Sequence, residues 1–214
     1  MTLVAVLDYA AITMFALTGA LVASREQLDI VGFAFLACLT GMGGGTLRDL
    51  LLDRDVFWIA DPVYLVSATL AAVGVFFLAH RLESRWETLK WLDAAALSVA
   101  VAAGAVITAD AGEALPVIVV MGMITGCVGG LARDVVSNEV PLMLRPGQLY
   151  VTCAFSGSLA LALADLAGAP SALSAVLAAV VCFVLRAGAI RRGWELPIYK
   201  PRPKTDASHP DNDK

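Results

Sequence analysis

Two copies of one motif hold the residues of this sequence best suited to bind an ion. The pattern Thr-Gly-x-x-Gly-Gly-x-x-Arg-Asp covers residues 40–49 and, 85 positions later, residues 125–134. Consecutive glycines permit a break or kink in a helix, which exposes backbone carbonyl oxygens. Carbonyls at such a break could coordinate a cation, and the N-terminus of a broken helix could hold an anion. The predicted kink and binding positions are Gly41, Gly43, Gly44, Gly45, Gly126, Gly129 and Gly130.

Each motif ends in charged residues, although it lies inside a long apolar run. A charge deep in hydrocarbon costs about 3 kcal/mol or more, so these residues need partners. Adjacent helical side chains point about 100° apart, and we therefore do not expect either arginine to pair with the aspartate that follows it. Residues at matching depths predict Asp8–Arg48 and Asp93–Arg133 contacts instead. The charges expected beside the site are Asp8, Arg48, Asp49, Asp93, Arg133 and Asp134.

The elements that must position these residues are membrane helices. The chain has 214 residues, of which 59% are hydrophobic and 16% charged, and its mean hydropathy is +0.78. A soluble domain is nearer half apolar and a quarter charged. The predicted fold is all-α, a polytopic membrane domain over residues 1–193 with seven transmembrane helices. The expected spans are Leu3–Ser24, Ile30–Leu52, Pro62–His80, Trp91–Thr108, Leu115–Val136, Gln148–Leu166 and Ala172–Ile190.

The offset of 85 defines an internal repeat of three helices, about residues 3–80 and 91–167, with a seventh helix over about 172–190. Three crossings are an odd number, so the second repeat must enter the membrane upside down relative to the first. Inverted repeats of this kind often place a substrate or ion site near the midplane. The polar tail over 194–214 is expected to be cytoplasmic, and disordered past about Lys200.

Lysine and arginine counts predict the orientation. The side that holds the N-terminus has only Arg48 and Arg54. The other side has Arg25, Arg81, Arg85, Lys90, Arg133, Arg145, Arg186 and the basic tail. We therefore expect a protein of the cytoplasmic membrane, with its N-terminus outside and its C-terminus inside.

Several function classes find no support in the sequence. The net charge of −4 and the lack of a basic patch argue against a nucleic-acid partner. Walker, HExxH and GxSxG motifs are absent, so we expect neither an enzyme nor a cofactor. Glu139 is expected to be a solvated loop charge. The cysteines have no metal-ligand spacing and are expected to be packing residues; they are Cys38, Cys127, Cys153 and Cys182.

The segments "GMGGGTLRDLLL" and "GCVGGLARDVVSNEVPLMLRPGQLY", in a three-plus-three-plus-one helix arrangement, resemble the prokaryotic branch of the trimeric intracellular cation (TRIC) channel family. The resemblance covers residues 3 to about 200 and includes "WELPIY" after the last helix. One departure is Val128, which interrupts the second glycine triplet, so a weaker kink is expected there.

The resemblance implies a homotrimer in which each protomer has its own hourglass-shaped pore, bounded by kinked second and fifth helices. It implies conduction of monovalent cations, chiefly K⁺, with Na⁺ as a further permeant ion and no other metal. By residue match, Gly43, Gly44, Gly45, Gly129 and Gly130 are the pore-bending positions, with Arg48, Asp49, Arg133 and Asp134 beside them.

Two other functions compete with a channel. Some bacterial relatives with these motifs are classed as glycine transporters, and an alternating-access carrier could hold a small zwitterion at the same broken helices. Saturable uptake would favour the carrier, and unitary currents would favour the channel. A purely structural membrane protein is the third alternative, but a costly motif that occurs twice argues against it.

Overall fold

The computed structural model describes residues 2–81, 84–145 and 149–197, and the regular structure of these residues is entirely helical. The helices are α1 (Leu3–Arg25), α2 (Ile30–Leu51), α3 (Phe57–Ala60), α4 (Val63–Leu78), α5 (Arg85–Asp110), α6 (Leu115–Val136), α7 (Tyr150–Leu166) and α8 (Ser171–Arg192). Two 3₁₀ turns follow α4 and α6, namely η1 (Ala79–Arg81) and η2 (Leu142–Leu144).

The predicted seven-helix membrane architecture is confirmed. Among the described residues, six helical segments are long and apolar enough to cross a bilayer, and α7 is a shorter apolar helix of 17 residues. At 1.5 Å per residue, α7 is about 26 Å long. The short α3 and η2 were not predicted, because elements of three or four residues leave no periodic pattern. The disorder expected past Lys200 concerns residues outside the described range.

Helix α5 begins at Arg85, six residues before the predicted start at Trp91. The Ser84 side chain accepts a hydrogen bond from the Glu87 amide at 3.2 Å and caps the helix there. The first turns of α5 carry charged residues, and for that reason hydropathy alone places the start of the helix too late.

Left-handed residues end the helices at equivalent places in the two repeats. After α1 and α5, they are Gln27 (φ 55°) and Gly112 (φ 79°). After α2 and α6, they are Asp53 (φ 51°) and Asn138 (φ 54°). Each of these residues lies 85 positions from its counterpart, so the sequence offset is also the structural offset.

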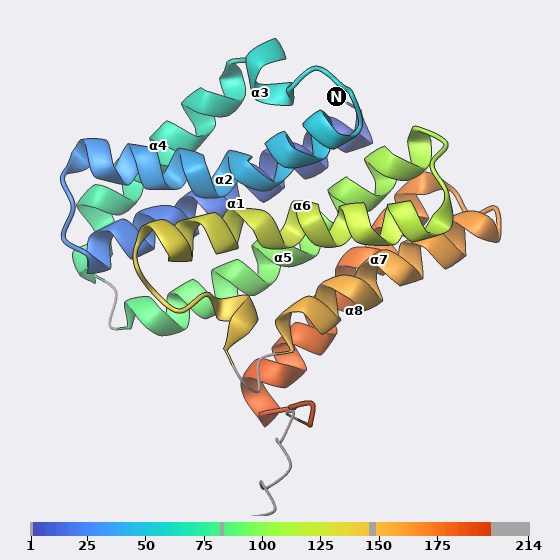
Figure 1. Cartoon of the computed structure of the whole chain (residues 1–214). Coiled ribbons are helices and arrows are strands. Elements are labelled where there is room, and N and C mark those ends of the chain that lie inside the picture. Colours follow the sequence, from blue (N-terminus) through green and yellow to red (C-terminus); the bar gives the residue numbers. More distant parts are fainter. Residues whose placement is uncertain (1, 82–83, 146–148, 198–214) are drawn as a thin grey trace, which may run out of the picture.

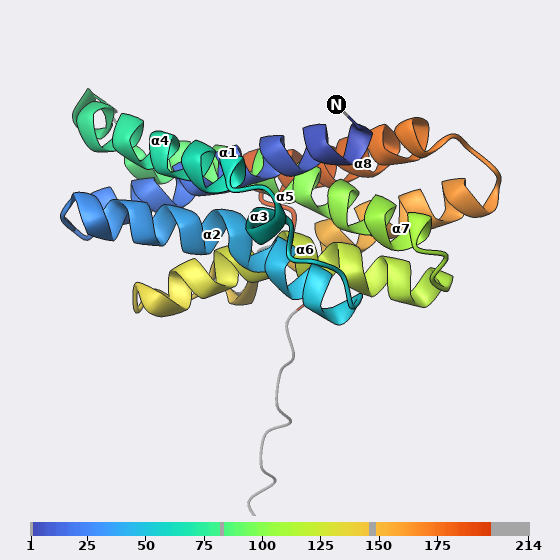
Figure 2. The same ribbon diagram turned by 90° about the horizontal axis from the view of Figure 1, so that it is seen from above.

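The repeats form two three-helix bundles that pack along their first and second helices. Helices α1, α2 and α4 form one bundle, and α5, α6 and α7 form the other (Figure 1). Helix α1 packs on α5, α2 packs on α6, and α8 covers α5 and α7 (Figures 1 and 2). Helix α5 is the most deeply buried span, since a run of alanines and Gly104 lets its neighbours approach closely.

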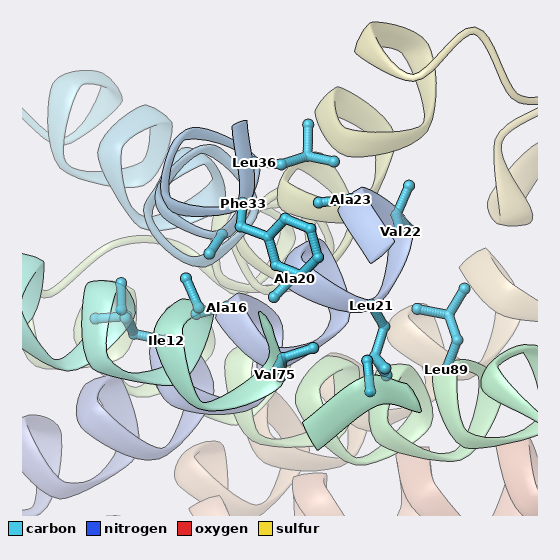
Figure 3. Packing of buried hydrophobic residues seen from close by; sticks show 14 of the residues in the cluster. Ile12, Ala16, Ala20, Leu21, Val22, Ala23, Phe33, Leu36, Val75 and Leu89 are labelled. Atoms are coloured by element: carbon cyan, nitrogen blue, oxygen red, sulfur yellow. The ribbon is translucent and has the colours of Figure 1, made fainter. Parts of the chain in front are cut away.

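Buried apolar residues fill the first bundle. Figure 3 shows Ile12, Ala16 and Leu21 of α1 packed with Phe33 and Leu36 of α2. Leu89, near the start of α5, joins the same cluster, so the core of the first repeat extends to the second.

Candidate functional site

The two glycine clusters meet where α2 and α6 cross. A Cβ atom at Gly44 would overlap the carbonyl oxygen of Thr125, and one at Gly129 would overlap the carbonyl oxygen of Thr40. Gly43 faces the same crossing, since a Cβ there would lie 3.7 Å from the Gly129 Cα. Each motif thus packs its glycine against the threonine carbonyl of the other motif, and the helices approach more closely than any side chain would allow.

The helices are not broken at the motif glycines, and the predicted kink at these positions stays a prediction. Helices α2 and α6 run without interruption through residues 43–45 and 129–130. Consecutive glycines permit either a break or a close crossing, and here the facing backbone decides for the crossing. Val128 fits this arrangement, because it lies in an apolar groove with Phe35 and Trp58 rather than against a backbone.

The other motif glycines pack against different residues. A Cβ at Gly41 would lie 3.0 Å from the Ile12 carbonyl oxygen of α1, and one at Gly126 would overlap Val101 of α5. Gly45 and Gly130 lie under aromatic side chains, those of Phe57 and Tyr150 respectively.

The predicted contacts between aspartate and arginine are confirmed. Arg48 Nη1 lies 2.9 Å from Asp8 Oδ1, and Arg133 Nη1 lies 3.0 Å from Asp93 Oδ1. All four residues are buried. The pairs therefore join α1 to α2 and α5 to α6 in the same way.

The expectation that adjacent Arg and Asp residues do not pair is wrong. Arg48 Nε lies 2.8 Å from Asp49 Oδ1, and Arg133 Nε lies 2.8 Å from Asp134 Oδ1. The Cα–Cβ bonds diverge, but the long arginine side chain bends so that Nε faces the neighbouring carboxylate while Nη1 reaches the other helix. Each guanidinium therefore binds two carboxylates.

The second oxygen of the motif aspartate holds the loop that follows. Asp49 Oδ2 accepts the Phe57 amide at 3.0 Å, and Asp134 Oδ2 accepts the Leu142 amide at 2.8 Å. These bonds hold α3 in the loop after α2 and η2 in the loop after α6. In each repeat, the motif aspartate thus connects the buried ion cluster to the loop that follows the second helix.

Helix α3 is held by a further bond that the second repeat lacks. Trp58 Nε1 donates a hydrogen bond to Thr46 Oγ1 at 2.9 Å, whereas the position equivalent to Thr46 in the second repeat is Leu131.

We expect Thr46→Val to lower the free energy of unfolding by about 0.5–1.5 kcal/mol and to shift Trp58 fluorescence. Thermal unfolding in detergent measures the first effect. Thr69→Val is the matched control, because exposed Thr69 donates its hydroxyl hydrogen to the Leu65 carbonyl of its own helix, and an equal loss in both variants would contradict the assignment.

The two ion clusters differ in their surroundings. Arg133 Nη1 also donates to Thr18 Oγ1 of α1 at 2.8 Å. The counterpart of Thr18 is Ala103, so the repeat pattern gave no reason to single out Thr18. Within the described chain, Asp93 Oδ2, Arg133 Nη2 and Tyr150 Oη are buried without a hydrogen-bond partner. Buried polar atoms of this kind are normally satisfied by ordered water.

A polar cavity of about 300 Å³ opens beside the first ion cluster. It is lined by residues from the start of α1, the end of α2 and the region of α3, including four carboxylates and two guanidinium groups. The carboxylates are those of Asp8, Asp49, Asp55 and Asp61, and the guanidinium groups are those of Arg48 and Arg54. With more acidic than basic groups, its lining favours cations over anions.

A narrower cavity continues from there toward the crossing of α2 and α6. Its volume is about 20 Å³, which is room for about one water molecule. Asp8 and Phe57 line both cavities, and Thr40, Gly44 and Thr125 lie at the inner one. The two cavities therefore share Asp8 and Phe57, and the inner one reaches the glycine crossing.

Glu139 is not the solvated loop charge that was expected. Its carboxylate lies 3.0 Å from Arg25 Nη1 and 3.6 Å from Arg145 Nη2, and it is largely buried. A single acidic residue just after a membrane helix gives no sign of such partners, since one comes from the other repeat.

Comparison with known proteins gives matches over most of the chain. A family model described as "Glycine transporter" matches residues 5–80 and again residues 90–166. The two matches confirm the internal repeat. The UPF0126 inner membrane protein YadS of Escherichia coli K12 is 37% identical over 198 residues, which cover 90% of this chain and 94% of that protein.

Solved structures share the fold. The trimeric intracellular cation channel orthologue from Rhodobacter sphaeroides superposes with a TM-score of 0.87 at 39% identity, covering 90% of this chain and all of the other. A structure described for conductance through TRIC cation channels gives a TM-score of 0.83 at 28% identity, over 94% of this chain and 100% of the other.

Proposed function

The chain belongs to the prokaryotic TRIC channel family, to which the UPF0126 proteins and the glycine-transporter family model also correspond, and on that premise we propose that it conducts potassium ions passively through a pathway within each protomer. Na⁺ is a further permeant ion under this proposal. A channel performs no covalent chemistry on the ion, so no catalytic residue is required.

The polar cavity beside the first ion cluster is the observation that carries the proposal. It leads from the surface to buried charged residues in a protein of membrane-spanning helices. Ionisable residues at such depth are rare and usually mark an ion or substrate pathway. We propose that the pathway is bounded by α2 and α6 and passes beside their glycine crossing, with the six motif and partner charges next to it.

The hydroxyl oxygens of Thr40 and Thr125, which lie at the inner cavity, are suited to weak, transient coordination of K⁺. Each arginine is held between two carboxylates, so its repulsion of a passing cation is reduced. Weak sites of this type suit conduction, which requires that an ion leave as readily as it enters.

The assembly and orientation are part of the same proposal. The Rhodobacter sphaeroides relative is described as trimeric, and we infer a homotrimer with one pathway per protomer. The chain would lie in the cytoplasmic membrane with its N-terminus and the polar cavity outside. The distribution of Lys and Arg supports that orientation.

A glycine carrier is the second candidate, favoured by one specific feature. Asp8 and Arg48 place a carboxylate and a guanidinium at the same cavity, and a zwitterion carries the two complementary charges. The cavity volume of about 300 Å³ is ample for glycine. The description of the family model points in the same direction.

Measuring potassium flux and radiolabelled glycine uptake in the same proteoliposomes distinguishes the channel from the carrier. We expect fast, non-saturating K⁺ flux that glycine does not affect, and an Asp8→Asn variant with about tenfold lower flux, since it removes a carboxylate from the pathway. Asp165→Asn, at an exposed helix end, is the matched control and should behave as the parent. Saturable glycine uptake without potassium current would replace the channel by the carrier.

A further inference from the structure

Charges of opposite sign occupy equivalent positions at the ends of the two repeats. Arg25 is the last residue of α1, and its counterpart Asp110 is the last residue of α5. Glu139 follows α6, and its counterpart Arg54 follows α2. The first repeat therefore offers two basic residues at these positions, and the second repeat offers two acidic ones.

The equivalence is structural as well as numerical. The Arg54 amide donates to the Asp49 carbonyl at 2.9 Å, and the Glu139 amide donates to the Asp134 carbonyl at 2.9 Å. The residue before each of them has a left-handed backbone, and so does the residue two positions after Arg25 and Asp110. The same loop and the same helix end thus present the two charges in both repeats.

The Arg25–Glu139 pair is formed. Its nitrogen–oxygen distance is 3.0 Å, and it joins the end of α1 to the loop after α6. The Trp86 ring of α5 lies between Arg25 and Arg145, with guanidinium carbons 5.0 and 4.7 Å from its centroid. Leu89, one turn further along α5, is 1% exposed. The ion pair and the Trp86 ring thus lie over this end of α5, where Leu89 is buried.

The Arg54–Asp110 pair is not formed, since no ion pair among the described residues joins these two side chains. Arg54 instead lines the polar cavity together with Ile107, which lies one helical turn before Asp110. Val4, the counterpart of Leu89, lines the same cavity. The Arg54–Asp110 pair, which is equivalent to Arg25–Glu139, is therefore separated at the end of the protein where the polar cavity lies.

We propose that Arg25–Glu139 and Arg54–Asp110 are alternative ion pairs, each of which closes one end of the pathway, so that ions pass only while neither pair is formed. In a second conformation the Arg54–Asp110 pair forms and the cavity beside Val4 closes. The Arg25–Glu139 pair separates, and Leu89 becomes accessible from the opposite side. The inference rests on the proposed function in one respect, because it takes the pathway to run between the two repeats.

The opposite charge of the two repeats at both positions is what distinguishes this proposal from ordinary surface charges. Unrelated solvated charges have no physical reason to be complementary at both ends. Like charges at the same distance would repel, so keeping opposite signs in each pair preserves an attraction that can form at either end. Each ion pair shifts the equilibrium between the two conformations only by the difference between its interaction free energies in them.

Labelling of single cysteines by an impermeant maleimide tests the proposal. The full-length chain would carry Val4→Cys or Leu89→Cys, with Cys38→Ala to reduce background, in proteoliposomes. Glu139→Gln is expected to raise the labelling rate at position 89 about fivefold and to lower it at position 4, since a partly buried pair shifts the populations by about that factor.

A matched control and a rescue sharpen the test. Glu87→Gln removes another ion pair, with Lys90, from the same end of the molecule, and should change neither rate. Exchanging the charges, Arg25→Glu with Glu139→Arg, should restore the parent rates. In the Glu139→Gln background, cysteines replacing Arg54 and Asp110 should cross-link faster under mild oxidation than they do in the parent.

Equal increases at both positions in Glu139→Gln would mean a general loosening and would overturn the proposal, as would unchanged rates. The labelling does not depend on ion flux. If labelling rises at position 89 and falls at position 4 but the vesicles pass no potassium, the alternative ion pairs are supported and the proposed channel function is rejected. If the vesicles pass potassium but Glu139→Gln does not change the labelling, the channel function is supported and the alternative ion pairs are rejected.

Discussion

Replacing Arg133 by methionine should lower the free energy of unfolding by about 3–5 kcal/mol, because two buried carboxylates would lose their shared cation. Asp93 and Asp134 both bind this guanidinium, at 3.0 and 2.8 Å, and Thr18 loses its donor as well. Methionine fills a similar volume, so the effect reports charge rather than a cavity. Reversible unfolding in mixed micelles measures it.

Arg48→Met is the matched control, since it removes the same two kinds of ion pair from the other repeat. Asp8 lies at the polar cavity, where water can solvate the carboxylate that is released. A smaller loss of about 1–3 kcal/mol is therefore expected. Equal losses in the two variants would show that the cavity does not hydrate Asp8, and would weaken its assignment to an ion pathway.

The sequence predicted this part of the site because the relevant information is local or periodic. Depth along a helix follows from counting residues, and Asp8 and Arg48 therefore had to lie at one level. The offset of 85 then required the same of Asp93 and Arg133. Apolar runs long enough to span a bilayer predicted the seven helices for the same reason.

Other features depend on tertiary partners that no local pattern specifies. A glycine triplet is compatible with a broken helix and with a close crossing, and the Thr125 carbonyl facing Gly44 is what selects the crossing. Thr18 contacts Arg133 from the opposite repeat, and Glu139 contacts Arg25 in the same way. Ala103 stands at the position equivalent to Thr18, and the Arg54–Asp110 pair equivalent to Arg25–Glu139 is not formed, so the repeat did not reveal either contact.

This difference between the repeats bears on function. The shared elements, which are the glycine crossing and the ion clusters, are the parts from which the proposed pathway would be built. Among the unshared contacts, those of Thr18 and Trp86 lie toward the end that holds the Arg25–Glu139 pair, whereas the Trp58–Thr46 bond lies beside the polar cavity. The fold therefore supplies two equivalent ends, while a few side chains decide which of them is open in this conformation.

Gly129→Ala should destabilise the protein by about 1–3 kcal/mol, as expected for overpacking. The new methyl group would overlap the Thr40 carbonyl oxygen, and a backbone atom within a helix cannot turn aside as a flexible side chain can. Helices α2 and α6 must therefore move apart. Thermal unfolding in detergent measures the loss of stability, and potassium flux should change in the same variant if the pathway follows this crossing.

Two other glycines supply controls within the same structure. A Cβ at Gly43 would meet the Gly129 Cα at 3.7 Å, an ordinary contact, and one at Gly74 of α4 would meet nothing within 4 Å. Alanine at either position should be neutral or stabilise the helix by up to about 1 kcal/mol. If Gly43→Ala proved as harmful as Gly129→Ala, then helix flexibility rather than close approach would be the property that the motif preserves.

The double variant Gly44→Ala with Gly129→Ala distinguishes these explanations further. Both methyl groups would act on one crossing, and once the first has separated the helices the second meets less resistance. The combined loss should therefore be smaller than the sum of the single losses, by about 0.5 kcal/mol or more. Strict additivity would mean that the two glycines act independently, as they would if each only permitted bending of its own helix.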